Sequence, residues 1–344
     1  MLQNISISLV TLILLFILCE VLTRIVVYFE NQKSFKKAIS SLPEITKGKS
    51  VSLRSIIQPS KYRKIIYELR PYASVYYENV LVQTNSQGWR GAKEFSLDKD
   101  RDTVRVVGLG DSFMFGQGVN QDETALGFLE KELNTRFPQK KWEIINTAVP
   151  GYNTVMQIEA LQKKVLVYKP DIVMMEIIGN DFDLPNFIYE LDSCLDITKS
   201  FFIELLLQRF KSRKENFKLF DAPFSYSSNS FENDPRKVPL QYRDMVGWDS
   251  FVRAAKELKK LQTKNNFIVI VYRTSSVFDK EIDSLCKQLG FHAIFNFFDW
   301  IEDLSLVVSK ADRHPNAKQN KKTAEKILNY MTEKEIIYNF LRKR

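Results

Sequence analysis

Cysteine, glycine and proline are all scarce in this chain of 344 residues. Three cysteines with no CxxC pair exclude a disulfide framework and a zinc site built from paired cysteines. With 12 glycines and 11 prolines, the chain falls outside the collagen-like and low-complexity classes. Hydrophobic residues make up 44% and charged residues 26%, so global disorder is excluded as well. The length and composition predict one or two folded domains with a sizeable core.

The excess of positive charge, a net +9, is concentrated in two segments. Residues 31–70 hold ten Lys and Arg against two acidic residues, and residues 310–344 hold ten against four. A nucleic-acid enzyme more often carries its basic residues around the active site, interleaved with aromatics. The sequence contains no helix-turn-helix, zinc-finger or RNA-recognition signature. We therefore expect no nucleic-acid partner, and we interpret the C-terminal basic segment as a solvated face.

The N-terminus is a long apolar run. No charge occurs from Met1 to Cys19, and apolar residues resume after Glu20 and Arg24, which lie one helical turn apart and can pair. About 20 apolar residues span a bilayer, so residues 5–28 are predicted to form one transmembrane helix. A cleaved signal peptide would need a positively charged start and a small-residue cleavage site. A lipoprotein would need a small residue before Cys19, where Leu18 stands.

A basic segment follows this helix directly. We therefore expect membrane lipids to be the partner of both the helix and the basic segment. Lys and Arg beside a span usually mark the cytoplasmic side, which would place most of the chain in the cytoplasm. Alternatively, the segment binds anionic headgroups of whichever leaflet it meets, and the two interpretations remain open. We expect three parts: an anchor at 1–30, a basic juxtamembrane and accessory region at 31–102, and a catalytic domain at 103–344.

The catalytic domain alternates strand-like and helix-like segments. Before it, Ser74–Val82 reads as a strand and Asn85–Gly88 as a turn. Repeated alternation predicts a parallel sheet covered by helices on both faces, interrupted by a helical insert at about 190–245. The predicted strands are 104–109, 142–149, 171–178, 267–272 and 291–298. The predicted helices are 123–136, 153–168, 248–262 and 317 to the C-terminus.

Residues that could take part in catalysis follow the carboxyl ends of these strands, where ligands bind in parallel sheets. Ser112 follows the first strand within Gly110-Asp111-Ser112, in a turn that matches neither a phosphate-binding loop nor a GxSxG elbow. The second and third strands are followed by Gly151 and Asn180, and the fifth by the segment that contains Asp312 and His314. An acyl-transfer site needs a nucleophile, a base, a group that orients the base, and oxyanion donors. All four parts occur here.

This ordered set resembles the SGNH hydrolases, the GDSL-like family of esterases and acyl hydrolases. The family is named for residues in four blocks, matched here by Ser112, Gly151, Asn180 and His314, and the resemblance covers about residues 103–330. It implies a three-layer α/β/α fold with a flavodoxin-like parallel sheet of about five strands. It also implies a serine esterase that needs neither metal nor cofactor.

The resemblance assigns roles to these residues. Ser112 would be the nucleophile and His314 its base, while the backbone N–H groups of Ser112 and Gly151 and the amide of Asn180 would bind the oxyanion. Asp312 would orient the base, two residues before it, whereas many members place the acid three residues before, where this chain has alanine. Other acids of the same region therefore remain open: Asp299, Glu302 and Asp303.

The favoured function is a membrane-anchored esterase that hydrolyses an O-acyl ester linked to carbohydrate or lipid. An O-acyltransferase that passes the acyl group to a glycan with the same triad remains open, as does a non-catalytic binding protein of the same fold. The chain contains one other histidine, His292, which precedes an apolar run and is interpreted as structural. The acyl chain, the alcohol and the oligomeric state are not determined by the sequence.

Overall fold

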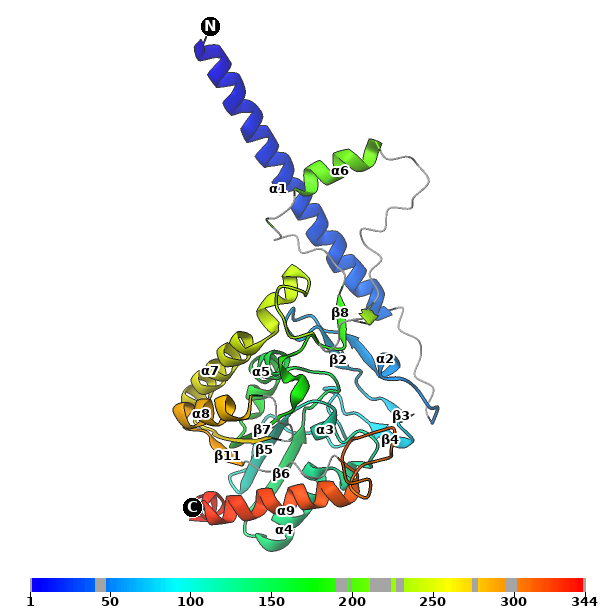
Figure 1. Cartoon of the computed structure of the whole chain (residues 1–344), viewed down its shortest axis with the longest axis vertical. Helices are drawn as coiled ribbons and strands as arrows, with labels where there is room; N and C mark the ends of the chain where they lie inside the picture. The colour runs from blue at the N-terminus through cyan, green and yellow to red at the C-terminus, as the bar shows by residue number, and fades with distance from the viewer. Residues whose placement is uncertain are drawn as a thin grey trace. The chain divides into compact units, whose positions relative to one another are not determined.

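The fold was analysed in a computed structural model (Figure 1), which describes residues 2–40, 48–189, 197, 200–210, 224–226, 232–273, 278–294 and 302–342. The chain divides into two compact units. Unit 1 comprises residues 1–42 and 188–226, and unit 2 comprises residues 43–187 and 227–344. Each unit has its own secondary structure and is described by itself.

Unit 1 is built on a long N-terminal helix, α1 (Leu2–Ser40), against which a second helix, α6 (Phe201–Phe210), packs. Two short strands, β8 (Phe187–Tyr189) and β9 (Phe224–Tyr226), pair with each other. The stretch Ser8–Lys33 of α1 is long and apolar enough to cross a membrane. The predicted apolar helix at 5–28 is therefore confirmed as a helix, within the longer α1.

Unit 2 contains a sheet of five parallel strands in the order β11-β10-β7-β5-β6. This is the flavodoxin-like order, so the predicted fold class is confirmed. The strands are β5 (Thr103–Leu109), β6 (Lys141–Asn146), β7 (Ile172–Ile177), β10 (Ile268–Arg273) and β11 (His292–Ile294). The second strand ends three residues before the predicted Val149, and the remainder of the predicted fifth strand, 295–298, lies outside the described residues.

Helices cover both faces of the sheet (Figure 1). On one face α4 and α9 pack together, and on the other α5 packs against α7 and α7 against α8. The helices are α4 (Ala125–Arg136), α5 (Thr154–Ala160), α7 (Trp248–Asn265), α8 (Asp279–Leu289), α9 (Ala317–Glu333) and α10 (Ile336–Arg342). The predicted helix at 153–168 is not continuous, because a π-helical turn (Leu161–Val165) and a 3₁₀ turn (Leu166–Tyr168) follow α5.

Residues 48–102 form an accessory layer of short elements in unit 2. They are α2 (Leu53–Ile56), β1 (Ile57–Pro59), β2 (Tyr67–Leu69), β3 (Ser74–Tyr77) and β4 (Val80–Gln83). The single strand predicted at Ser74–Val82 is wrong: it is the antiparallel hairpin β3–β4. The chain reverses at Glu78 and Asn79, both in the left-handed region at φ 49° and 64°. The turn predicted at Asn85–Gly88 is confirmed.

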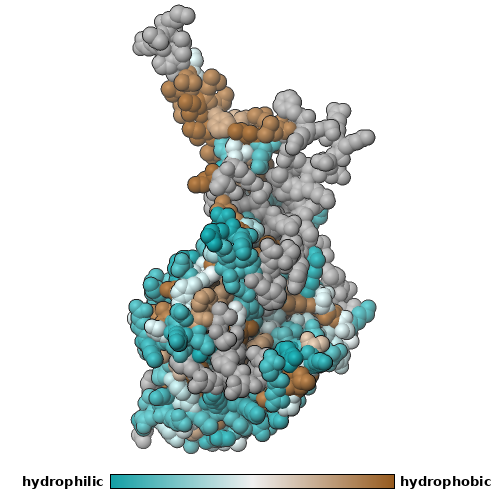
Figure 2. Space-filling model, viewed as in Figure 1, coloured by the Kyte–Doolittle hydropathy of each residue, from teal (hydrophilic) through white to brown (hydrophobic). Residues whose placement is uncertain are grey.

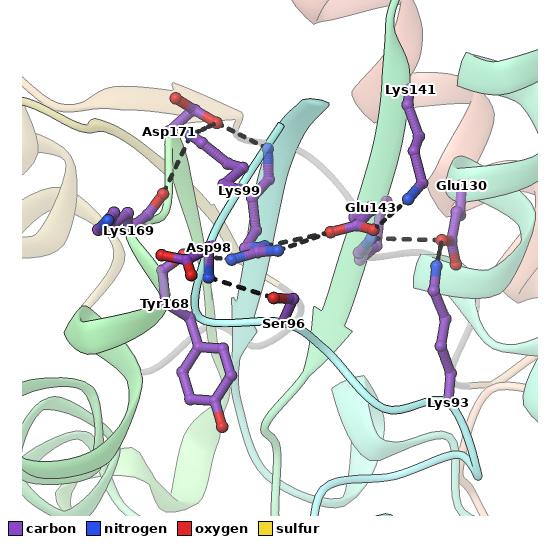
Figure 3. Close-up of polar contacts among 12 residues, drawn as sticks. Lys93, Ser96, Asp98, Lys99, Glu130, Lys141, Glu143, Tyr168, Lys169 and Asp171 are labelled. Carbon is purple, nitrogen blue, oxygen red and sulfur yellow. Dashed lines mark hydrogen bonds and ion pairs between the residues drawn. The ribbon is translucent and has the colours of Figure 1, made fainter. Parts of the chain in front are cut away.

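Buried charges in unit 2 include an ion pair between neighbouring strands of the sheet. Arg105 on β5 donates through Nη2 to Oε2 of Glu143 on β6 at 2.8 Å, and both side chains are almost fully buried. The Arg105 guanidinium also donates to the carbonyl of Tyr168 at 2.6 Å, and Lys141 pairs with the other oxygen of Glu143 (Figure 3). These contacts satisfy the buried charges, so we interpret the cluster as structural.

Candidate active site

Ser112 stands at the carboxyl end of β5, in the first position of the short helix α3 (Ser112–Phe115). The preceding Asp111 caps this helix, because its Oδ1 accepts the backbone N–H of Phe113 at 3.0 Å. Gly110 allows the tight turn, since a Cβ there would lie 2.4 Å from Cβ of Met114. Because Asp111 provides the N-cap, the hydroxyl of Ser112 is not needed to cap the start of α3.

His314 connects the serine to a carboxylate. Its Nε2 lies 2.8 Å from Oγ of Ser112, and its Nδ1 lies 2.5 Å from Oδ1 of Asp312. The same carboxylate oxygen accepts the backbone N–H of His314 at 3.0 Å. The ring of Phe113 packs edge-on against the imidazole, with 5.1 Å between centroids. The structure therefore brings together three of the predicted site residues in one hydrogen-bonded chain, although Ser112 and His314 are 202 positions apart in sequence.

The loop that carries Asp312 and His314 is held by its own backbone and by Asn316. The amide N–H of Val308 donates to the carbonyl of His314 at 2.9 Å, which closes the loop. Nδ2 of Asn316 donates to the carbonyl of Val307 at 3.0 Å, while Oδ1 caps α9 by accepting the N–H of Gln319 at 3.2 Å. These bonds fix the position of His314 relative to the start of α9.

Of the alternative acids, the structure describes Glu302 and Asp303, and neither forms a hydrogen bond or an ion pair with His314. Glu302 and Asp303 are exposed, and the carboxylate of Asp303 accepts the N–H of Ser305 at 2.9 Å. Asp299 lies outside the described residues. Burial raises the pKa of Asp312, but hydrogen bonds from the ring and backbone of His314 outweigh it, so the net pKa is below its usual value. Asp312 is therefore ionised at neutral pH, as an orienting acid must be.

Gly151 lies on the loop after β6, next to the serine turn. The N–H of Val149 donates to the carbonyl of Gly110 at 3.3 Å, which brings the two loops together. Gly151 has φ +80°, and a Cβ there would lie 2.5 Å from Nδ2 of Asn186 and 2.8 Å from the hydroxyl of Tyr67. The positive φ therefore favours glycine at this position, and any other residue would also have to displace the side chain of Asn186.

Asn180 reaches the serine turn through Asp111. It lies in a 3₁₀ turn (Gly179–Phe182) after β7, and its Nδ2 donates to Oδ2 of Asp111 at 3.0 Å. The same carboxylate oxygen lies 3.3 Å from Oγ of Ser112. The buried Oδ1 of Asn180 has no hydrogen-bond partner within the described part of the chain. The amide is thus held at the carboxyl ends of the two adjacent strands β5 and β7.

Beneath the serine turn lie three buried carboxyl groups, a feature that the sequence did not reveal. Asp111, Glu176 and Asp181 are 1%, 4% and 2% exposed. Burial, reinforced by the neighbouring carboxylates, raises the pKa of Glu176 well above its usual value and that of Asp181 to about 8. Burial also raises the pKa of Asp111. The sequence could have indicated this cluster only through Glu176, an acidic residue within an otherwise apolar strand.

These raised pKa values predict that the free energy of unfolding falls as the pH rises. In the unfolded chain Asp181 titrates near 4, whereas in the folded chain its pKa is about 8. The folded state holds the extra proton between these values, so its stabilising effect is complete below about pH 4 and is lost as the pH rises through 8. Denaturant unfolding of the full chain in non-ionic detergent at pH 6 to 9 measures the slope of the free energy of unfolding against pH. Asp181→Asn should flatten it, and equal slopes for both chains would contradict the assignment.

His292 and Cys286 take no part in the hydrogen bonds around Ser112. His292 is the first residue of β11, within the strand predicted at 291–298, and its Nδ1 lies 3.4 Å from the hydroxyl of Tyr330. Burial, followed by the nearby Lys334, lowers the pKa of His292. Cys286 is buried, which raises its pKa to about 12. Cys194 lies outside the described residues.

Comparison with known proteins gives a family match and several similar folds. The model of the GDSL-like lipase/acylhydrolase family matches residues 106–327. The crystal structure of TesA is 12% identical and covers 67% of this chain and 98% of its own, with a TM-score of 0.41. The psychrotrophic esterase EstA from Pseudoalteromonas sp. is 13% identical and covers 67% and 97%, with a TM-score of 0.41. The acetyl xylan esterase AlAXEase is 14% identical and covers 66% and 98%, with a TM-score of 0.39. No curated protein matches the chain.

Proposed function

Since the chain belongs to the GDSL-like lipase/acylhydrolase family, we propose that this ester-hydrolysing enzyme is a membrane-anchored serine esterase with the triad Ser112, His314 and Asp312. One observation carries the triad: His314 bonds to the hydroxyl with one ring nitrogen and to the carboxylate with the other. The substrate class that we propose is an O-acyl ester linked to carbohydrate or lipid.

The proton movements follow from the hydrogen bonds. With the Nδ1 proton of His314 donated to the ionised Asp312, Nε2 is an acceptor and takes the proton of the Ser112 hydroxyl. Oγ then bonds to the ester carbonyl carbon, and the carbonyl oxygen becomes an oxyanion. When this intermediate collapses, the carbon–oxygen bond to the alcohol breaks and His314 returns the proton to the departing alcohol. Water hydrolyses the acyl-enzyme by the same steps, with His314 again as the base.

The proposed oxyanion hole consists of the backbone N–H groups of Ser112 and Gly151 and the amide of Asn180. The positive φ of Gly151 and the hydrogen bond that orients the amide of Asn180 support this, because both residues lie at the carboxyl end of the sheet beside the serine turn. Each such donor contributes about 10²–10³-fold to the rate in enzymes of this kind. The bond from Asn180 to Asp111 keeps the amide oriented before substrate binds.

A substrate panel tests the proposed activity. Full-length protein in detergent is assayed with nitrophenyl esters of increasing acyl length and with acetylated sugars, and is incubated with a fluorophosphonate that labels active serines. Ester turnover and labelling are expected together. Labelling without hydrolysis, with acyl transfer to an added glycan, would assign the acyltransferase activity instead. The absence of both would indicate a binding protein.

We further propose that α1 spans a membrane and anchors residues 103–344 as the catalytic domain, with 31–102 as the juxtamembrane and accessory region. Leu12 and Leu14 are 63% and 61% exposed, so the helix presents its apolar surface outward rather than to a protein core. Within the span, Nε of Arg24 lies 2.7 Å from Oε1 of Glu20, so the two charges are paired. Paired charges reduce the cost of burial in a bilayer.

The anchor predicts membrane association that salt does not reverse. At about 1 M salt the screening length falls to about 3 Å, which removes attraction between the basic segment and anionic headgroups but leaves apolar burial intact. The full chain should therefore remain in the pelleted membranes, and its intact mass should show no N-terminal cleavage. Recovery of the chain in the supernatant, or a mass lacking the first residues, would contradict a spanning helix.

A further inference from the structure

Helix α6 begins directly on the side of α1. The carboxylate of Glu20 accepts the backbone N–H groups of Phe201 and Phe202 at 3.2 and 3.0 Å, and the hydroxyl of Ser200 at 2.6 Å. The first N–H groups of a helix have no partner within the helix, and a carboxylate stabilises that end. A side chain of α1 therefore caps α6, and this contact joins two segments that are 180 residues apart.

Aromatic contacts strengthen the same attachment. The guanidinium of Arg24 lies over the ring of Phe201 at 5.0 Å, while also pairing with Glu20. The rings of Phe16 and Phe202 meet edge to face, with 5.8 Å between centroids. The first turn of α6 is thus fixed to the part of α1 between Phe16 and Arg24. This part lies in the middle of the stretch Ser8–Lys33.

Helix α6 also presents apolar side chains that the described part of the chain leaves exposed. Ile203, Leu205, Leu206 and Leu207 are between 43% and 59% exposed. Figure 2 shows the hydrophobic colour running from α1 onto α6. Three consecutive exposed leucines point in different directions around a helix, so the exposure is not confined to one face that a single neighbouring helix could cover. Such a helix is stable in an apolar surrounding.

We propose that α6 lies in the same bilayer that α1 spans, as a second membrane element supplied by the insert. The inference rests on the proposed anchor, because a stretch of 26 residues is about 39 Å long and its middle falls inside a hydrocarbon layer of about 30 Å. A helix attached there continues the lipid-facing surface of α1. The lipid environment also accounts for Glu20, whose charge is matched both by Arg24 and by the N-terminus of α6.

Lipid quenching at single sites tests the proposal in the full chain. The three native cysteines are replaced by alanine, and one cysteine is introduced and labelled with the fluorophore NBD at Leu206 on α6, Leu14 on α1 or Leu240 in unit 2. All three side chains are well exposed, at 43%, 61% and 50%. The labelled proteins are placed in phosphatidylcholine–phosphatidylglycerol vesicles with and without nitroxide groups on the acyl chains. Ester hydrolysis by each labelled chain verifies that it is folded.

We expect nitroxide lipid to reduce the emission at position 206 as much as at position 14, and to leave position 240 unchanged. If nitroxide lipid quenched the emission at position 14 but left the emission at position 206 unchanged, as at position 240, the proposal would be overturned. A protein partner covering α6 would give that same result, because it would exclude the lipid. Loss of quenching at both 14 and 206 would refute the anchor itself, which separates the failure of the two proposals. Esterase activity is read independently of either outcome.

Discussion

Ser112→Ala is expected to abolish ester hydrolysis and leave the domain folded. The hydroxyl of Ser112 lies 2.8 Å from Nε2 of His314, in position to lose its proton as it attacks. Removing a triad nucleophile costs on the order of 10⁶-fold in kcat, because the remaining residues have no group to acylate. The fold should persist because Asp111, not Ser112, caps α3. Turnover of a nitrophenyl ester and the thermal unfolding midpoint measure the two effects.

Ser96→Ala is a matched control for this variant. Ser96 is an exposed serine whose hydroxyl accepts the N–H of Asp98 in a surface turn (Figure 3), and it takes no part in the hydrogen bonds around Ser112. It makes the same chemical change and should retain normal turnover. Near-normal turnover in Ser112→Ala would remove Ser112 from the mechanism, and loss of activity in both variants would point to a general effect of the substitutions on folding.

Much of the fold was predictable because the buried strands have a simple pattern. β5 and β7 are nearly continuous apolar runs that end in glycine-containing turns, and parallel strands buried on both faces take that form. Ser112 and Asn180 directly follow those runs, so their positions at the strand ends could also be predicted from the sequence. Ser112 and His314 are 202 residues apart, however, and their contact depends on the strand order, which the residues alone do not determine.

The errors have local physical reasons. The sequence predicts one strand where the hairpin at 74–83 lies because its turn contains no glycine. Glu78 and Asn79 adopt the left-handed conformation there instead. Helix α8 was not predicted, although Ile282, Leu285 and Cys286 lie at helical spacing and are buried. The burial of Glu176 beside two other carboxyl groups could not be inferred, because Asp111 follows a different strand, β5, and only the fold brings it next to Glu176.

Asp312→Asn is expected to reduce turnover by up to about 10⁴-fold while the loop keeps its shape. Oδ1 of Asp312 accepts both the ring Nδ1–H and the backbone N–H of His314. If the amide of asparagine turns its NH₂ group toward the ring, it stabilises the wrong tautomer of His314. If it turns its oxygen there, the bonds remain but the charge that stabilises the imidazolium is lost. Both orientations impair proton transfer, so the loss does not depend on which one the variant adopts.

The comparison that decides the identity of the acid uses four amide variants assayed side by side. Glu302→Gln and Asp303→Asn are the matched controls, since both side chains are exposed and neither bonds to His314. Asp299→Asn completes the set. We expect only Asp312→Asn to lose most of its turnover, because Asp312 lies two residues from His314 and its Oδ1 is 2.5 Å from Nδ1 of that ring. If Asp312→Asn lost less than about tenfold while one of the others collapsed, the orienting role would pass to that residue, since a triad acid contributes far more than tenfold.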